Sequence, residues 1–184
     1  MNHLGNAGQF IVDTIFSLVL YLVILRFWMQ WARANFRNPI GQLVINLSNP
    51  AVIPLRRLIP SIGSIDTATL LLALAIVIIK VYILVALAGS TPAWVSLLLY
   101  SVGEIIKASI NLFSAAIIIQ IIASWINPHA YHPILDIARA IAEPLMAPAR
   151  RLIPSMGGLD LSPMLVFFIL RLCLILIVSP LQHA

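Results

Sequence analysis

One stretch of this sequence occurs twice, and each copy lies between two long apolar runs. Shifting the sequence by 94 residues aligns 31–66 with 125–160 without a gap, and thirteen of the 36 aligned positions are identical. The match is densest from Arg56 to Asp66 and from Arg150 to Asp160. A repeat of fixed period indicates one structural unit used twice. We therefore expect two equivalent units, at 1–93 and 94–184.

The composition indicates that both units sit in a membrane. The chain is 61% hydrophobic and 9% charged, whereas a soluble domain has about 25% charged residues. Crossing about 30 Å of hydrocarbon takes about 20 helical residues. Four runs are long enough, at 10–29, 68–88, 104–125 and 162–178. The sequence therefore predicts an all-α membrane protein with four transmembrane helices, arranged as two tandem hairpin repeats.

The apolar run at 94–125 is too long for one straight span, because its helix would measure about 48 Å. The sequence Ser101-Val102-Gly103 is the natural place for a break. We therefore expect a separate interfacial segment at 94–100, followed by the span. The first apolar run is too long for the core of a signal peptide, so we expect it to remain in the mature protein.

The basic residues predict the orientation. They gather in the first and third connections, which contain Arg33, Arg37, Arg56 and Arg57, and Arg139, Arg150 and Arg151. Loops rich in Lys and Arg stay on the cytoplasmic side. Both loops should then be cytoplasmic and both termini periplasmic. Because both hairpins insert the same way up, we expect parallel repeats related by a pseudo-twofold axis along the membrane normal.

Each cytoplasmic loop should open with an amphipathic helix lying in the interface. These helices would start at Pro39 and Pro133, with Asn38 as a good N-cap and His132 as a weaker one. Further prolines follow at positions 50, 54, 144 and 148. Since proline cannot donate a backbone hydrogen bond, we expect these prolines to end the helices and turn the chain back toward the membrane.

Each loop then carries a charged motif. It consists of Arg56, Arg57 and Asp66 in the first copy, and of Arg150, Arg151 and Asp160 in the second. Paired arginines can bind lipid phosphate or a partner protein, or they can act as topology anchors bridged to the aspartates. The aspartates can equally cap the next span, with Ser162 as a competing cap. The Ile-Pro-Ser-x-Gly sequence between them predicts a tight turn whose glycine takes a positive φ.

Several charges fall inside or at the edges of the spans: Arg26, Lys80, Glu104, Lys107 and Arg171. Such charges normally face the bundle, water or a partner. Lys80 and Arg171 would either line an anion-attracting cavity or bind a partner's carboxylate. Alternatively, Lys80 snorkels and Arg171 bonds to backbone or polar groups of neighbouring spans, for which Asp13, Asn111, Ser114 and Gln120 are candidates. Glu104 and Lys107 have the i, i+3 spacing of an ion pair.

Other functional classes find little support. The net charge of +5 lies in short clusters beside the spans, without the interleaved aromatics of a nucleic-acid-binding face. Cys173 is alone, so a disulfide framework within the chain is excluded. His129-x-x-His132 has a metal-compatible spacing but lacks a third ligand. No catalytic motif occurs, so we predict neither an enzyme nor a metal or cofactor site.

The motif Pro-x-x-x-Pro-x-Arg-Arg-x-Ile-Pro-Ser-x-Gly-x-x-Asp, leading into a span, resembles that of the YggT family. Its duplication over almost the whole chain resembles the two-copy proteobacterial members; single-copy relatives include the YlmG or SepG proteins of Gram-positive bacteria and chloroplasts. The resemblance implies a small bacterial inner-membrane protein without catalytic residues. It also implies links to osmotic or potassium stress, cell division, or the assembly of haem-bearing complexes.

The sequence and the resemblance together predict a non-catalytic scaffold or assembly factor. Its arginine pairs would hold the loops on anionic lipid and present a platform to other inner-membrane proteins, with self-assembly as a further possibility. The alternative is an ion channel or a modulator of transport, suggested by the intramembrane cations. A third reading is haem or cofactor delivery through His129 and His132.

Overall fold

The fold is described from a computed structural model, over residues 3–126, 132–153 and 160–183. Four spans in these ranges are long and apolar enough to cross a membrane. They are α1 (His3–Trp31), α3 (Thr67–Leu87), α4 (Trp94–Ile126), and a composite span of α6 (Ser162–Cys173), the π-helical η1 (Leu174–Val178) and α7 (Ser179–His183). The predicted all-α architecture with four spans is confirmed. The first, third and fourth spans extend beyond their predicted ends.

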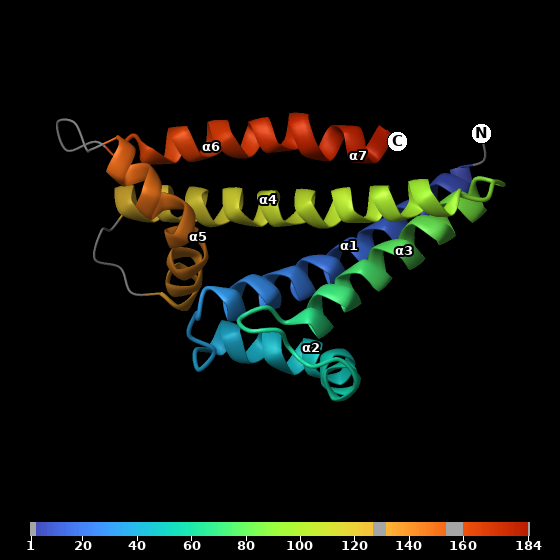
Figure 1. Cartoon of the computed structure of the whole chain (residues 1–184), viewed down its shortest axis with the longest axis horizontal. Coiled ribbons are helices and arrows are strands. Elements are labelled where there is room, and N and C mark those ends of the chain that lie inside the picture. Colours follow the sequence, from blue (N-terminus) through green and yellow to red (C-terminus); the bar gives the residue numbers. More distant parts are fainter. Residues whose placement is uncertain (1–2, 127–131, 154–159, 184) are drawn as a thin grey trace.

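The two hairpins run in the same direction (Figure 1). The start of α1, the end of α7 and the α3–α4 connection lie at one end of the molecule, and α2 (Pro39–Leu58) and α5 (Pro133–Leu152) lie toward the other. Within each hairpin the two spans pack against each other, α1 on α3 and α4 on the composite fourth span. The predicted architecture of two parallel tandem hairpin repeats is therefore confirmed.

α4 runs unbroken through residues 101–103, so the predicted break and the separate interfacial segment before it are wrong. The small residues at this point allow close packing instead. A Cβ on Gly103 would lie 3.2 Å from side-chain atoms of both Leu181 and Gln182. Ser101 is buried, and its hydroxyl donates to a carbonyl one turn earlier. Small residues let membrane helices approach closely, and here they seat the C-terminal helix against α4.

α2 and α5 begin at the predicted prolines. The Asn38 side chain accepts a hydrogen bond from the Gly41 N–H at 2.7 Å, while His132 Nδ1 accepts from the Ile134 N–H at 3.3 Å. Contrary to expectation, both helices continue through their inner prolines. The two prolines of each helix are four residues apart and so share one side, where the missing N–H groups bend a helix without ending it. Figure 1 shows both helices changing direction.

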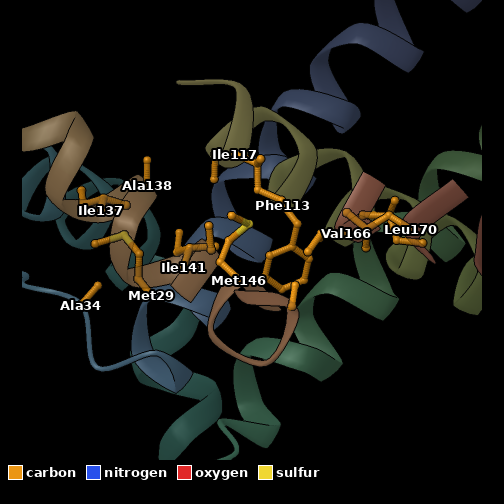
Figure 2. Packing of buried hydrophobic residues seen from close by; sticks show 14 of the residues in the cluster. Met29, Ala34, Phe113, Ile117, Ile137, Ala138, Ile141, Met146, Val166 and Leu170 are labelled. Carbon is orange, nitrogen blue, oxygen red and sulfur yellow. The ribbon is translucent and has the colours of Figure 1, made fainter. Parts of the chain in front are cut away.

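The larger buried cluster is built around α5. This helix contributes Ile137, Ile141 and Met146, against which Phe113 of α4 and Met29 of α1 are buried (Figure 2). A smaller cluster joins α1, α3 and the first half of α4. α2, the counterpart of α5 in the first repeat, buries fewer residues. The two repeats therefore share one fold but not one environment, so the expected pseudo-twofold relation is not exact.

Candidate functional site

In the first repeat, Arg56 closes the loop between α2 and α3. Its guanidinium forms an ion pair with Asp66, with an Nε–Oδ1 distance of 3.3 Å, and also donates to the side-chain oxygen of Gln30 on α1. The intervening turn contains Gly63 with a φ of +61°, as predicted. One arginine thus connects the end of the first span, the amphipathic helix and the start of the second span.

Asp66 combines two roles that the sequence left as alternatives. It is the N-cap of α3, accepting from the Thr69 N–H at 3.4 Å and from the Thr69 hydroxyl, while it also pairs with Arg56. Burial opposes ionisation of this carboxyl, but the hydrogen bonds from Arg56 and Thr69 outweigh burial and hold its pKa below the ordinary value. Asp66 is therefore a buried, charged and fully engaged group.

The second repeat carries a looser version of the same arrangement. Arg150 pairs with Glu143 at 3.0 Å and with Asp160 at 3.4 Å, and all three side chains are more than two-fifths exposed. Asp160 accepts from the Ser162 N–H at 2.9 Å. Ser162 is the first residue of α6, so the competing cap suggested for it is not formed. Ion pairs this exposed stabilise a protein little.

The second arginine of each pair is in a different situation from the first. Arg57 and Arg151 are both exposed. Within the part of the chain that the structure describes, neither side chain has a hydrogen bond or an ion pair. Each Arg-Arg pair therefore consists of an internally paired residue, Arg56 or Arg150, and an exposed neighbour that has no partner among the described residues.

Arg26 is a further anchoring residue, which the sequence indicated only as a charge at a span edge. It is 5% exposed, and its Nη1 donates to Ser48 Oγ at 2.6 Å and to Asn49 Oδ1 at 2.8 Å. At the same repeat position, Gln120 donates to the Ala138 carbonyl at 3.1 Å. Each amphipathic helix is thus tied to its preceding span by a polar side chain, which the 94-residue alignment could have revealed.

A second charged site lies toward the other end of the molecule, around Lys80. Its ammonium lies 3.1 Å from Asp13, 3.2 Å from Glu104 and 3.3 Å from the Ser17 hydroxyl, and its side chain is only 4% exposed. The snorkelling orientation considered for Lys80 is therefore wrong. Because Asp13 belongs to the first repeat and Glu104 to the second, this lysine joins the two repeats.

Glu104 extends the network around Lys80. It pairs with Lys107 at 3.5 Å, as the i, i+3 spacing predicted, and accepts from Gln182 at 2.8 Å. These residues line a cavity of about 500 Å³, together with Asp13 and apolar side chains of α3 and α4. Two ammonium groups there face two carboxylates, so the cavity has no excess of positive charge.

Arg171 does not join Lys80 in that cavity. It is exposed on α6 and has no ion pair within residues 3–126, 132–153 and 160–183. Of its suggested partners, Asp13 pairs with Lys80, Asn111 donates to a tyrosine hydroxyl, and Gln120 donates to backbone carbonyls. The Arg171 side chain is therefore exposed, and among the described residues no hydrogen bond or ion pair joins it to a neighbouring span.

Only one member of the histidine pair suggested for metal or haem lies within the described residues. His129 lies outside the described residues, and His132 uses Nδ1 to cap α5. No group of three potential metal-binding side chains occurs among the residues whose positions are described.

Comparisons with known proteins agree with the repeat. The CCB3/YggT family model matches residues 5–87 and again residues 99–181, and the second match begins and ends 94 residues after the first. No solved structure matches the chain.

Similar proteins occur in several proteobacteria. The chain is 40% identical to the "Uncharacterized protein in proC 3'region" of Vibrio alginolyticus over 88% of both chains. It is 38% identical to an uncharacterized protein of Pseudomonas aeruginosa, over 96% of this chain and 90% of that protein. It is 36% identical to the "Uncharacterized protein YggT" of Escherichia coli K12, over 90% and 86% respectively. The resemblance found in the motif thus holds for both halves of the sequence, and the chain belongs to the CCB3/YggT family.

Proposed function

We propose that this protein is a non-catalytic scaffold or assembly factor, which presents Arg57 and Arg151 to anionic lipid headgroups and to partner membrane proteins. The observation that carries the proposal is the division of each arginine pair. Arg56 pairs with the buried Asp66, and Arg150 pairs with Glu143 and Asp160, so neither of these arginines depends on its neighbour for a partner. The exposed guanidiniums are then free to bind an external anion.

The chemistry of arginine suits this role. A guanidinium is always charged, and its planar fork matches the oxygens of a phosphate. A basic residue near an anionic membrane surface contributes about 1 kcal/mol to binding. Arg57 and Arg151 lie at the C-terminal ends of two helices from repeats of the same polarity. Two such contacts would hold both loops at one membrane surface, where a partner protein could contact them.

The proposal places the chain in the bacterial inner membrane, with α2 and α5 at the cytoplasmic face and both termini in the periplasm. The distribution of Lys and Arg supports this orientation, since the basic connections lie toward the end of the molecule opposite both termini. The links of related proteins to osmotic or ion stress and to envelope complex assembly fit a surface used by partners, and no reaction is needed to account for them.

The test compares the two arginines of each pair. We expect Arg57→Gln with Arg151→Gln to weaken retention of phosphatidylglycerol about thirty-fold, which is about 2 kcal/mol for two contacts. Native mass spectrometry of protein released from nanodiscs would measure it. The matched control, Arg56→Gln with Arg150→Gln, should lower thermal stability and retain lipid. The proposed function would be refuted if the wild type and both variants retained lipid equally and if membrane orientation and partner recovery were also unchanged.

The cavity around Lys80 favours one rival, an ion channel or a modulator of transport. Its charged lining and volume of about 500 Å³ are features that a transport pathway needs. Ion flux into liposomes containing the pure protein separates the two functions. If the rival holds, Lys80→Met abolishes flux and Arg171→Leu, which lies outside the cavity, does not. Absence of flux from the wild-type protein excludes the channel.

A further inference from the structure

Inside the chain, the second repeat docks onto the first through one face of α5. Ile137 and Ile141 of α5 are 5% and 2% exposed, in a buried cluster that includes Met29 and Ala34 of the first repeat (Figure 2). Contacts between α1 and α5 and between α2 and α5 belong to this interface. At its edge, Asn38 donates to the carbonyl of Pro133 at 3.4 Å.

The same face of the first amphipathic helix has no such cover. In the 94-residue alignment Ile137 and Ile141 correspond to Leu43 and Leu47 of α2, which are 53% and 60% exposed. α2 makes no contact with α4 in the described residues. An apolar face that the fold buries in one copy is therefore open in the other.

The surface that receives this face also occurs in both repeats. In the first repeat α5 covers it, and in the second repeat none of the described residues does. On the second repeat it is an apolar hollow of about 350 Å³, lined by Ile119, Ile122, Ala123, Ile126, Ile134 and Leu135, with His132 at its edge. The alignment places Ala123 on Met29 and His132 on Asn38, which are two of the first-repeat residues that α5 contacts or buries. Met29 and Asn38 are buried, whereas Ala123 is half-buried and His132 is exposed.

We propose that the α2 face of one molecule, formed by Leu43 and Leu47, docks into the apolar hollow around Ala123 of a second copy of this chain. This contact between two molecules would be equivalent to the interface that α5 forms within one molecule. It is head-to-tail, because two different surfaces meet, and such a contact gives a ring where the rotation between copies closes and an open array where it does not. A rotation about the membrane normal relates the copies, which keeps every copy in the same membrane orientation.

The fit to a second copy rests on continuity with an interface that the chain already uses. Both surfaces are apolar, and lipid alone could cover them. Lipid does not explain, however, why each surface has a counterpart in the other repeat and why those two counterparts bind each other inside the molecule. The proposal is independent of the lipid contacts suggested for Arg57 and Arg151, which are not part of either surface.

Site-directed crosslinking tests this contact in native membranes. With Cys173→Ala removing the single natural cysteine, Leu47→Cys is placed in one tagged copy and Ala123→Cys in a copy with another tag. A short bifunctional maleimide should join the two tags. Asn38→Cys with Pro133→Cys in one chain is the positive control, because these two residues meet at the edge of the equivalent internal contact. Ile79→Cys, at a 50% exposed position on α3, paired with Ala123→Cys is the negative control.

Each outcome decides the proposal. Crosslinks between Leu47→Cys and Ala123→Cys, at least ten times more abundant than in the negative control and lost on adding Leu43→Glu, support it. Crosslinks found only between two Leu47→Cys copies mean that like surfaces meet, which overturns the head-to-tail contact. If the internal control reacts and neither mixture does, lipid covers the α2 face and the proposal is wrong.

Discussion

Asp66 and Asp160 hold the same position in the two repeats, but only Asp66 is buried, with 1% of its side chain exposed against 42%. Asp66→Ala removes a cap and a charge-assisted hydrogen bond, and should cost about 2–3 kcal/mol of unfolding free energy. Asp160→Ala, the matched control, should cost less than about 1 kcal/mol. Unfolding in mixed micelles by a denaturing detergent measures both values. Equal losses would show that burial does not distinguish the two sites.

The lowered pKa of Asp66 gives this prediction a pH dependence. A carboxyl whose pKa is lower in the folded state stabilises the protein above its unfolded-state pKa, and that contribution disappears as the pH falls through the folded-state value. Since an unperturbed aspartate titrates near about 4, wild-type stability should decline below that pH. Asp66→Asn should flatten the decline, and an unchanged slope would contradict this account.

At the scale of single helices, the contact between α4 and the C-terminal helix depends on Gly103. A larger side chain there meets Leu181 and Gln182 at once, so Gly103→Leu should destabilise the protein by about 1–3 kcal/mol through overpacking. Gly8→Leu in α1 is the control, because a Cβ at Gly8 has nothing within 4 Å. Thermal unfolding in detergent should separate the two variants. Equal stability would mean that α7 does not rest on this glycine.

Helix positions were predictable wherever local chemistry decides them. Apolar length gave the four spans, Asn38 and Pro39 marked the start of α2, and the turn motif placed Gly63 at positive φ. Two local expectations failed. The break in α4 did not form because tertiary contacts with α7 support the helix there, and the inner prolines of α2 and α5 bend their helices without ending them.

At the scale of the whole molecule, the repeat correctly predicted two hairpins of one polarity, because an even number of spans per copy restores the chain to its starting side. The alignment did not reveal that Lys80 meets Asp13 and Glu104, or that Arg171 is exposed. Those outcomes depend on how the hairpins pack against each other, and the residue types alone do not predict that packing. Likewise, the sequence alone does not show that Arg56 forms an ion pair and Arg57 does not, because that difference depends on the position of Asp66 at the start of α3.

The start of α1 and the end of α7 lie at the same end of the molecule as the short α3–α4 connection. Joining the ends and reopening the chain within residues 89–93 would therefore give a circular permutant in which the second hairpin is translated first and every helix still inserts in its native direction. In such a permutant the covalent link between the hairpins changes, while the α5 contact that unites them is formed across the new junction. The arrangement of the two hairpins in the folded bundle therefore does not depend on which hairpin comes first in the sequence.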